Sequence, residues 1–286
     1  MSDEHPSIAI IGGGNMGSAL AGGLLANDHP AEKLYLSDPS AEKRKILETK
    51  YGLKASADNE SAVQAAEVVI FATKPQVLGP IAQSLATLIQ DNKALVISIA
   101  AGIPLTSLET WLGKEVPIVR CMPNTPALIG CGVSALFANE ATEVEQRLSA
   151  ENILGCVGST LWLDNEKQMD AVTALSGSGP AYFFLLMEAL QETGCQLGLT
   201  KEMSETLTLQ TAYGAALLAL ESGETISDLR HQVTSPGGTT EAALQIFEQA
   251  NFKKIVAMAL QAAQKRSQEL ALLLGTTETA NDRPLN

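Results

Sequence analysis

Residues 8–25, with the sequence IAIIGGGNMGSALAGGLL, decide the fold of the first half of this chain. Four apolar residues typical of a buried strand run into a glycine cluster, and an Ala- and Leu-rich helical segment follows. Gly12, Gly14 and Gly17 have GxGxxG spacing. The first would allow a tight turn, the second close approach of a pyrophosphate, and the third close packing of the helix on the strand. The stretch therefore predicts a dinucleotide-binding turn rather than an ordinary glycine-rich turn.

The same alternation of strands and helices continues to residue 164. Helical segments separate short apolar runs with little internal polarity, a pattern typical of a parallel sheet covered on both faces. We predict a doubly wound α/β domain with strands at 8–11, 34–37, 68–72, 95–99 and 116–120, completed by 133–137 and 160–163. The predicted helices lie near 15–27, 40–50, 76–90, 104–112 and 142–154.

Beyond residue 164 the pattern is purely helical. Helices are predicted near 166–174, 180–197, 201–222, 226–232, 238–248 and 252–273, and the tail from 275 to 286 is expected to fray. The chain thus divides into a Rossmann-type domain, 1–164, and an all-α domain, 165–286. Helix 180–197 is apolar on every side, so a second copy of the chain is expected to cover it.

Composition excludes several classes of protein. The net charge of -13 leaves no basic face for nucleic acid or an anionic membrane. Four cysteines without a CxxC pair indicate reduced, mostly buried thiols in the cytoplasm rather than zinc ligands or disulfides. No apolar stretch is long enough to span a membrane, and the start lacks a secretory signal. His5, His29 and His231 do not cluster, so no metal site is expected.

The end of the second predicted strand bears on the choice of dinucleotide. Asp38 can accept a hydrogen bond from a free ribose 2′-hydroxyl and would repel a 2′-phosphate. Four neighbours can instead hold that phosphate: Ser37, Ser40, Lys43 and Arg44. Asp38 or Ser40 can equally serve only as a cap for the next helix. The preference between the two nicotinamide dinucleotides stays open.

Later strand ends and two small-residue segments complete the candidate site. FATKP (71–75) and SIAAG (98–102) follow strands, although Lys74 can be a solvated lysine and Asn124, in MPNTP (122–126), a plain turn residue. LSGSGP (175–180) and VTSPGGTT (233–240) read as loops that begin helices, where amides and hydroxyls receive a carboxylate or merely cap the helix. SGSGP does not match GxSxG, which argues against a serine hydrolase.

No acid or base can be placed for a hydroxyacid dehydrogenase. A C=N substrate relaxes this demand, because an imine can be protonated before hydride arrives.

The motifs GGGNMG, ATKPQ, ISIAAG, RCMPNTPALIG, LSGSGPAYFF and TSPGGTTEAAL, in that order, resemble bacterial pyrroline-5-carboxylate reductases from about residue 8 to 270. The resemblance implies reduction of 1-pyrroline-5-carboxylate to L-proline by NADPH or NADH, the last step of proline biosynthesis. It also implies a Rossmann domain followed by a helical dimerisation domain, often assembled into rings of dimers.

The resemblance carries over to individual residues. Together with the fingerprint reasoning, it assigns the cofactor to Ile11, Gly12, Gly13, Gly14, Asn15, Met16, Gly17, Ser37, Asp38, Asn59, Ala72, Thr73, Lys74, Pro75, Ile99, Ala100 and Ala101. It assigns the substrate to Glu166, Ser235, Gly237, Gly238, Thr239 and Thr240. The Thr240 hydroxyl is the catalytic candidate, bonded to the ring nitrogen. Gln232 stands where some members have Asn, and Asp38 where many have a small polar residue.

Two alternatives remain at this stage. A related reductase of another cyclic imine or of a 3-hydroxyacid has the same architecture, but the latter predicts a catalytic lysine in the helical half. Lys167 and Lys201 adjoin neither SGSGP nor SPGGTT. A non-catalytic dinucleotide sensor would retain GGGNMG but have no need for SPGGTT.

Overall fold

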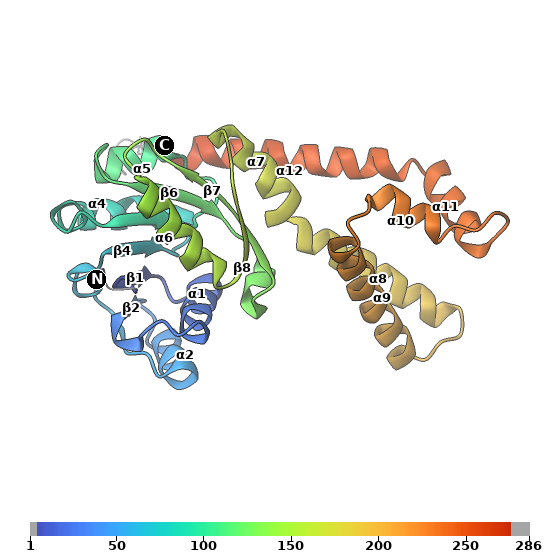
Figure 1. Ribbon diagram of the computed structural model, residues 1–286, viewed down its shortest axis with the longest axis horizontal. Coiled ribbons are helices and arrows are strands. Elements are labelled where there is room, and N and C mark those ends of the chain that lie inside the picture. The colour runs from blue at the N-terminus through green and yellow to red at the C-terminus, as the bar shows by residue number, and fades with distance from the viewer. Residues whose placement is uncertain (1–4, 276–286) are drawn as a thin grey trace, which may run out of the picture. The chain divides into compact units, whose positions relative to one another are not determined.

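The computed structural model describes residues 5–275 (Figure 1). Contacts divide the chain into an α/β unit, Met1–Ser178 with Ala263–Asn286, and a helical unit, Gly179–Ala262. The last strand ends at Trp162, so the change from strands to helices falls beside residue 164. The helices between 166 and 177 nevertheless belong to the α/β unit, which extends to Ser178. The boundary at 164 stays a prediction about domains, and the predicted fraying of the tail falls on residues beyond 275, outside the described ones.

The α/β unit contains one eight-stranded sheet in the order β3-β2-β1-β4-β5-β6-β7-β8. Its strands are β1 Ile8–Ile11, β2 Leu34–Ser37, β3 Ala55–Ser56, β4 Val68–Phe71, β5 Leu95–Ser98, β6 Ile118–Met122, β7 Gly132–Ala138 and β8 Gly158–Trp162. Chain order reverses at β1, which pairs in parallel with both β2 and β4. The doubly wound sheet expected from the sequence is confirmed.

Three details of the sheet differ from the prediction. β7 runs antiparallel to β6, because residues 123–131 are too few for the crossover that a parallel neighbour requires. β6 begins at Ile118 rather than at residue 116, after Pro117, which has no N–H to donate to a ladder. β3 was not predicted, because two residues carry no periodic pattern.

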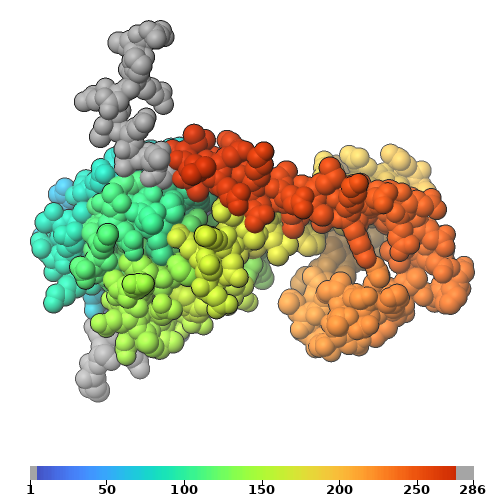
Figure 2. Space-filling model, turned by 90° about the horizontal axis from the view of Figure 1, so that it is seen from above, coloured from blue at the N-terminus to red at the C-terminus, as the bar shows by residue number. Residues whose placement is uncertain are grey.

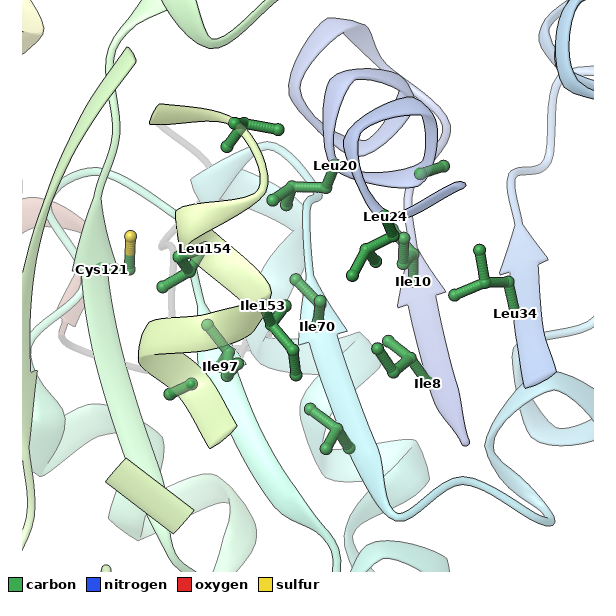
Figure 3. Close-up of a cluster of buried hydrophobic side chains, with 14 of the residues drawn as sticks. Ile8, Ile10, Leu20, Leu24, Leu34, Ile70, Ile97, Cys121, Ile153 and Leu154 are labelled. Atoms are coloured by element: carbon green, nitrogen blue, oxygen red, sulfur yellow. The ribbon is translucent and has the colours of Figure 1, made fainter. Parts of the chain in front are cut away.

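Helices cover both faces of the sheet. The first face packs against α1 Asn15–Ala26, α2 Ala41–Tyr51 and α6 Val144–Gly155. The second packs against α3 Asn59–Val63, α4 Pro75–Asp91 and α5 Leu105–Leu112. Figure 3 shows the first core, where side chains of β1 and β4 face Leu20 and Leu24 of α1 and Ile153 and Leu154 of α6. The two cores fix the strand ends that the site uses.

The segment 175–180 is helical rather than a loop, which corrects the prediction. α7 Met169–Val172 continues into a π-helical turn, η4 Thr173–Gly177, and then into α8 Gly179–Gln196. The Ser178 amide donates to the Thr173 carbonyl over 2.8 Å, five residues back, so the turn is wide enough to keep the backbone bonded. Pro180 is tolerated because it lies in the first turn of α8.

The helical unit consists of α8, α9 Lys201–Glu221, α10 Ile226–Gln232, α11 Thr239–Gln249 and the first part of α12 Phe252–Gly275. In the single chain it leaves large apolar side chains uncovered, including Phe183, Phe184 and Leu185 of α8, each 63–66% exposed. A second surface must cover them, as expected from the sequence. The last turns of α12 (red in Figure 2) belong to the α/β unit. Leu270 lies there against Gly102.

The four thiols are free, as predicted. The prediction that most of them are buried is wrong. Only Cys121 is buried, whereas Cys131 and Cys195 are exposed in the single chain. Cys131 follows Gly130, which ends η2 Thr125–Ile129 at the surface, so position in a turn overrides the usual burial of cysteine. Among the helices that the structure describes, none is long and apolar enough to cross a membrane.

Candidate functional site

The glycine turn lies at the carboxyl ends of β1 and β4, where the order of the strands reverses. Gly12 has a φ of 113°, and a Cβ there would approach the Ala72 carbonyl oxygen to 2.6 Å. A Cβ on Gly17 would overlap the Gly12 carbonyl oxygen. Both positions therefore require glycine for backbone conformation or packing alone.

Gly14 differs from its neighbours because nothing in the protein excludes a side chain there. It is the N-cap of α1, its φ is −71°, and a Cβ would meet no atom within 4 Å. No side chain caps α1, and no acidic residue lies in its first turn. The amides of Asn15, Met16 and Gly17 consequently begin a helix whose positive end is open to an anion, which fits the pyrophosphate of a dinucleotide.

Asp38 connects the end of β2 to the glycine turn. Only 4% of Asp38 is exposed, and its Oδ2 accepts a 2.9 Å hydrogen bond from the Gly13 amide and a 3.3 Å ion pair from Lys43 Nζ. Its Oδ1 accepts the Ser40 amide over 2.8 Å. The carboxylate therefore stands where the fingerprint places the group that contacts the adenosine ribose.

Ser37 and Asn59 meet beside Asp38. The Ser37 hydroxyl, completely buried, donates to Asn59 Oδ1 over 2.7 Å. The Asp38 amide donates to the Ser56 carbonyl in β3 over 3.0 Å. The structure thus brings Asn59, at the start of α3, to the strand end with which the sequence analysis grouped it.

The ends of β4 and β5 form the next part of the same edge. The Ala72 amide donates to the Ile11 carbonyl over 2.8 Å, and Ile99 donates to Phe71 over 3.1 Å, so 72–75 and 99–101 lie side by side. Lys74 is exposed and precedes Pro75, the first residue of α4. This position agrees with a solvated lysine before a helix. Buried Thr73 Oγ1 has no hydrogen-bond partner among the described residues. Such an unpaired hydroxyl fits an edge that receives a polar ligand.

The end of β6 packs against the π-helical turn. Asn124 accepts the Val133 amide over 2.9 Å through Oδ1 and donates through Nδ2 to the Ser176 hydroxyl over 3.3 Å. A side chain on Gly177 would overlap Met122. Asn124 is therefore more than a turn residue, because it ties MPNTP to SGSG.

Glu166 lies in the same unit, bonded to groups that the sequence analysis missed. Its Oε1 accepts from Arg120 Nη1 over 2.7 Å and from the Leu105 amide over 2.8 Å. Arg120 is 6% exposed and lies opposite Ser98 on β5. Arg120 could have been found in the sequence, because it is the one charged residue at the end of an apolar run. A charge buried in a strand needs a partner of opposite charge.

The SPGGTT segment lies in the helical unit between α10 and α11 (Figure 1). Gly238 is the N-cap of α11, so no side chain caps this helix, and Thr239 and Thr240 are its first two residues. Gly237 has a φ of 71°, and its amide donates to Glu241 Oε2 over 2.8 Å. Gln232 stands where some family members have Asn. Its Nε2 donates to Glu224 Oε2. Glu241 is not among the residues predicted for the site.

The described residues contain no group of three or more His, Cys, Asp or Glu side chains able to hold a metal ion.

A doubly wound sheet with this glycine turn, joined to a helical unit, defines a nicotinamide-dependent oxidoreductase. The comparisons agree: residues 7–102 match the family described as NADP oxidoreductase, coenzyme F420-dependent. Residues 166–270 match the family described as pyrroline-5-carboxylate reductase dimerisation, which supports homo-oligomerisation.

Full-length relatives narrow the class to one family. The chain is 50% identical to the pyrroline-5-carboxylate reductase of Pseudomonas aeruginosa, covering 94% of this chain and 98% of that one. A reductase structure from Coxiella burnetii is 43% identical with a TM-score of 0.89, covering 94% and 99%. One from Plasmodium falciparum, whose description states that NADP is bound, is 32% identical with a TM-score of 0.84, covering 94% and 99%. This chain belongs to the pyrroline-5-carboxylate reductase family.

Proposed function

We propose that this chain reduces 1-pyrroline-5-carboxylate to L-proline with NADPH or NADH, the last step of proline biosynthesis. The observation that carries the proposal is the match of 94% of the chain, through both units, to the Pseudomonas aeruginosa reductase. The alternatives are disfavoured because a sensor has no need of SPGGTT and a 3-hydroxyacid enzyme needs a lysine near it.

The cofactor is assigned to the edge formed by the glycine turn and the ends of β2, β4 and β5. The open space at Gly14, the uncapped start of α1 and the unpaired Thr73 hydroxyl support this assignment. The amides of residues 14–17 would bind the pyrophosphate. The small residues Ala72, Ala100 and Ala101 leave room for the ribose and nicotinamide. When bound, the reduced nicotinamide supplies the hydride.

The substrate carboxylate is assigned to the start of α11. The Ser235 hydroxyl and the amides of Thr239 and Thr240 offer hydrogen-bond donors at the positive end of the helix. The amides of Gly237 and Gly238 would join them by giving up the Glu241 carboxylate and the Ser235 carbonyl. Hydride adds to C5 of the C=N bond while the ring nitrogen receives a proton, which gives the secondary amine of proline. The Thr240 hydroxyl bonds that nitrogen, and the remaining acceleration comes from positioning and electrostatics.

We further propose that the protein acts in the cytoplasm as a homodimer or a ring of dimers. The exposed apolar side chains of α8 are the surface that the second copy would cover. The same subunit or its partner then supplies the start of α11 to each cofactor.

The test is the loss of NADH or NADPH absorbance when purified protein meets pyrroline-5-carboxylate, with proline measured as the product. Turnover with at least one cofactor is expected. Absence of turnover with both, from folded protein, would refute the proposal.

A further inference from the structure

In a dinucleotide-binding sheet of this kind, the residue at the end of β2 contacts the adenosine ribose, where NADH and NADPH differ. The sequence left two sets of side chains in competition there, one acidic and one suited to a 2′-phosphate. The structure shows which of these groups are already bonded within the chain.

Each of the groups suited to a 2′-phosphate makes a contact within the chain. Lys43 pairs with Asp38, and Arg44 Nη1 donates to the carbonyls of Asp38 and Pro39 over 2.7 and 3.0 Å. The Ser40 hydroxyl accepts the Lys43 amide as the N-cap of α2, and the buried Ser37 hydroxyl donates to Asn59. These contacts still leave the Ser40 O–H, two Lys43 N–H groups and the Nε and Nη2 of Arg44 as donors. What opposes a 2′-phosphate here is the buried negative charge of Asp38 beside them.

Asp38 retains capacity for a ribose hydroxyl. A carboxylate offers about four acceptor positions, and three donors use it: the amides of Gly13 and Ser40, and Lys43 Nζ. The fourth can accept a 2′-hydroxyl, which is a donor. A phosphate at that carbon has no proton to donate at neutral pH beyond a small fraction, and its charge would face the carboxylate.

Lys43 does not reverse this preference. Its side chain is 49% exposed, so it could turn toward a phosphate. Turning would leave Asp38, only 4% exposed, without its cation and beside a second negative group. The gain of one ion pair is thus offset by the loss of another.

We propose that Asp38 is the specificity-determining residue of this protein and makes NADH its preferred cofactor. Asp38 accepts a hydrogen bond from the adenosine ribose 2′-hydroxyl and repels a 2′-phosphate. The inference rests on the proposed dinucleotide site, and it goes beyond that proposal by choosing between the two cofactors.

The test is equilibrium binding of NAD⁺ and NADP⁺ by titration calorimetry, which needs no turnover. Wild-type protein is expected to bind NAD⁺ roughly tenfold to a hundredfold more tightly than NADP⁺, the size of one hydrogen bond to a charged group. Equal affinity, or tighter binding of NADP⁺, would overturn the inference while leaving the dinucleotide site intact. Binding of neither would overturn both.

Variants tie the preference to the residue. Asp38→Ser removes the charge, and Asp38→Asn retains an acceptor for the Gly13 amide if the serine variant does not fold. Each is expected to bring the affinity ratio to unity or below, as is the ratio of kcat/KM for NADH and NADPH. Glu42→Gln removes one exposed charge from the same helix and should keep the wild-type ratio. An unchanged ratio in the folded Asp38 variants would exclude Asp38 as the determinant.

Discussion

The carbonyl oxygen of Gly12 occupies the space that a Cβ of Gly17 would take. Helix α1 therefore approaches β1 as closely as the backbones allow, and one glycine serves packing alone. Gly14, three residues earlier, has open space around its Cβ position. The fingerprint thus contains positions with different physical demands, and substitutions can separate them.

Gly17→Ala should lower the free energy of unfolding by about 1–3 kcal/mol, because the methyl group forces the helix away from the strand. Gly14→Ser should leave stability within roughly 0.5 kcal/mol, since serine is a good N-cap, while weakening dinucleotide binding. Denaturant unfolding and calorimetric titration measure the two effects. Unchanged binding in Gly14→Ser would remove that position from the pyrophosphate site.

Thr240→Ala should lower kcat by roughly tenfold to a hundredfold without abolishing turnover, because one hydrogen bond to the reacting nitrogen is lost. Thr240→Ser retains the hydroxyl and should recover most of the rate. Steady-state kinetics at saturating cofactor provide the measurement. Wild-type kinetics in the alanine variant would exclude Thr240 from the mechanism.

Glu241 bears on the affinity for substrate, because its carboxylate accepts the Gly237 amide that the substrate carboxylate is proposed to use. Glu241→Gln retains an acceptor but removes the competing charge from the helix start. The KM for pyrroline-5-carboxylate should fall about fivefold, the equivalent of about 1 kcal/mol, with little change in kcat. An increase in KM would show that Glu241 supports the site instead.

The Arg120–Glu166 pair should contribute to stability. Glu166→Gln leaves a guanidinium that is 93% buried without its counter-charge, so unfolding should become easier by about 1–3 kcal/mol. Glu269→Gln breaks the exposed pair with Arg266 and should cost no more than roughly 0.5 kcal/mol. Denaturant unfolding compares the two. A raised KM in Glu166→Gln at unchanged stability would favour substrate binding as the main role of this carboxylate.

His29 should make stability depend on pH. Burial, followed by the positive charges of His5 and Lys33, lowers its pKa below 6.5. The unfolded chain therefore binds more protons than the folded one as pH falls below 6.5. The stabilising contribution is complete above 6.5 and is lost as pH falls through the lower pKa of the folded state. Between pH 7.5 and 5, the unfolding free energy of wild type should therefore fall more steeply with decreasing pH than that of His29→Gln. Parallel curves would contradict this.

The sequence predicted local structure well where apolar runs or helical patterns were bounded by clear turn residues. The strands at 8–11 and 34–37 and the helix at 226–232 begin and end where the pattern does. It failed where tertiary packing overrides local preference. Glycine and serine in 175–180 predicted a loop, but packing against Met122 and Asn124 keeps the backbone in a π-helical turn.

The alternation of strands and helices and the dinucleotide fingerprint were determined by the sequence, because glycine spacing and apolar runs act through the nearby backbone. The Arg120–Glu166 pair and the bonds made by Asp38 were decided only in the folded chain. Each depends on groups distant in sequence that meet at one edge of the sheet, as Gly13 and Asp38 do. Nothing in the sequence shows a partner for Lys43 or Arg44. Only the tertiary structure shows that Lys43 pairs with the Asp38 carboxylate and that Arg44 donates to the carbonyls of Asp38 and Pro39.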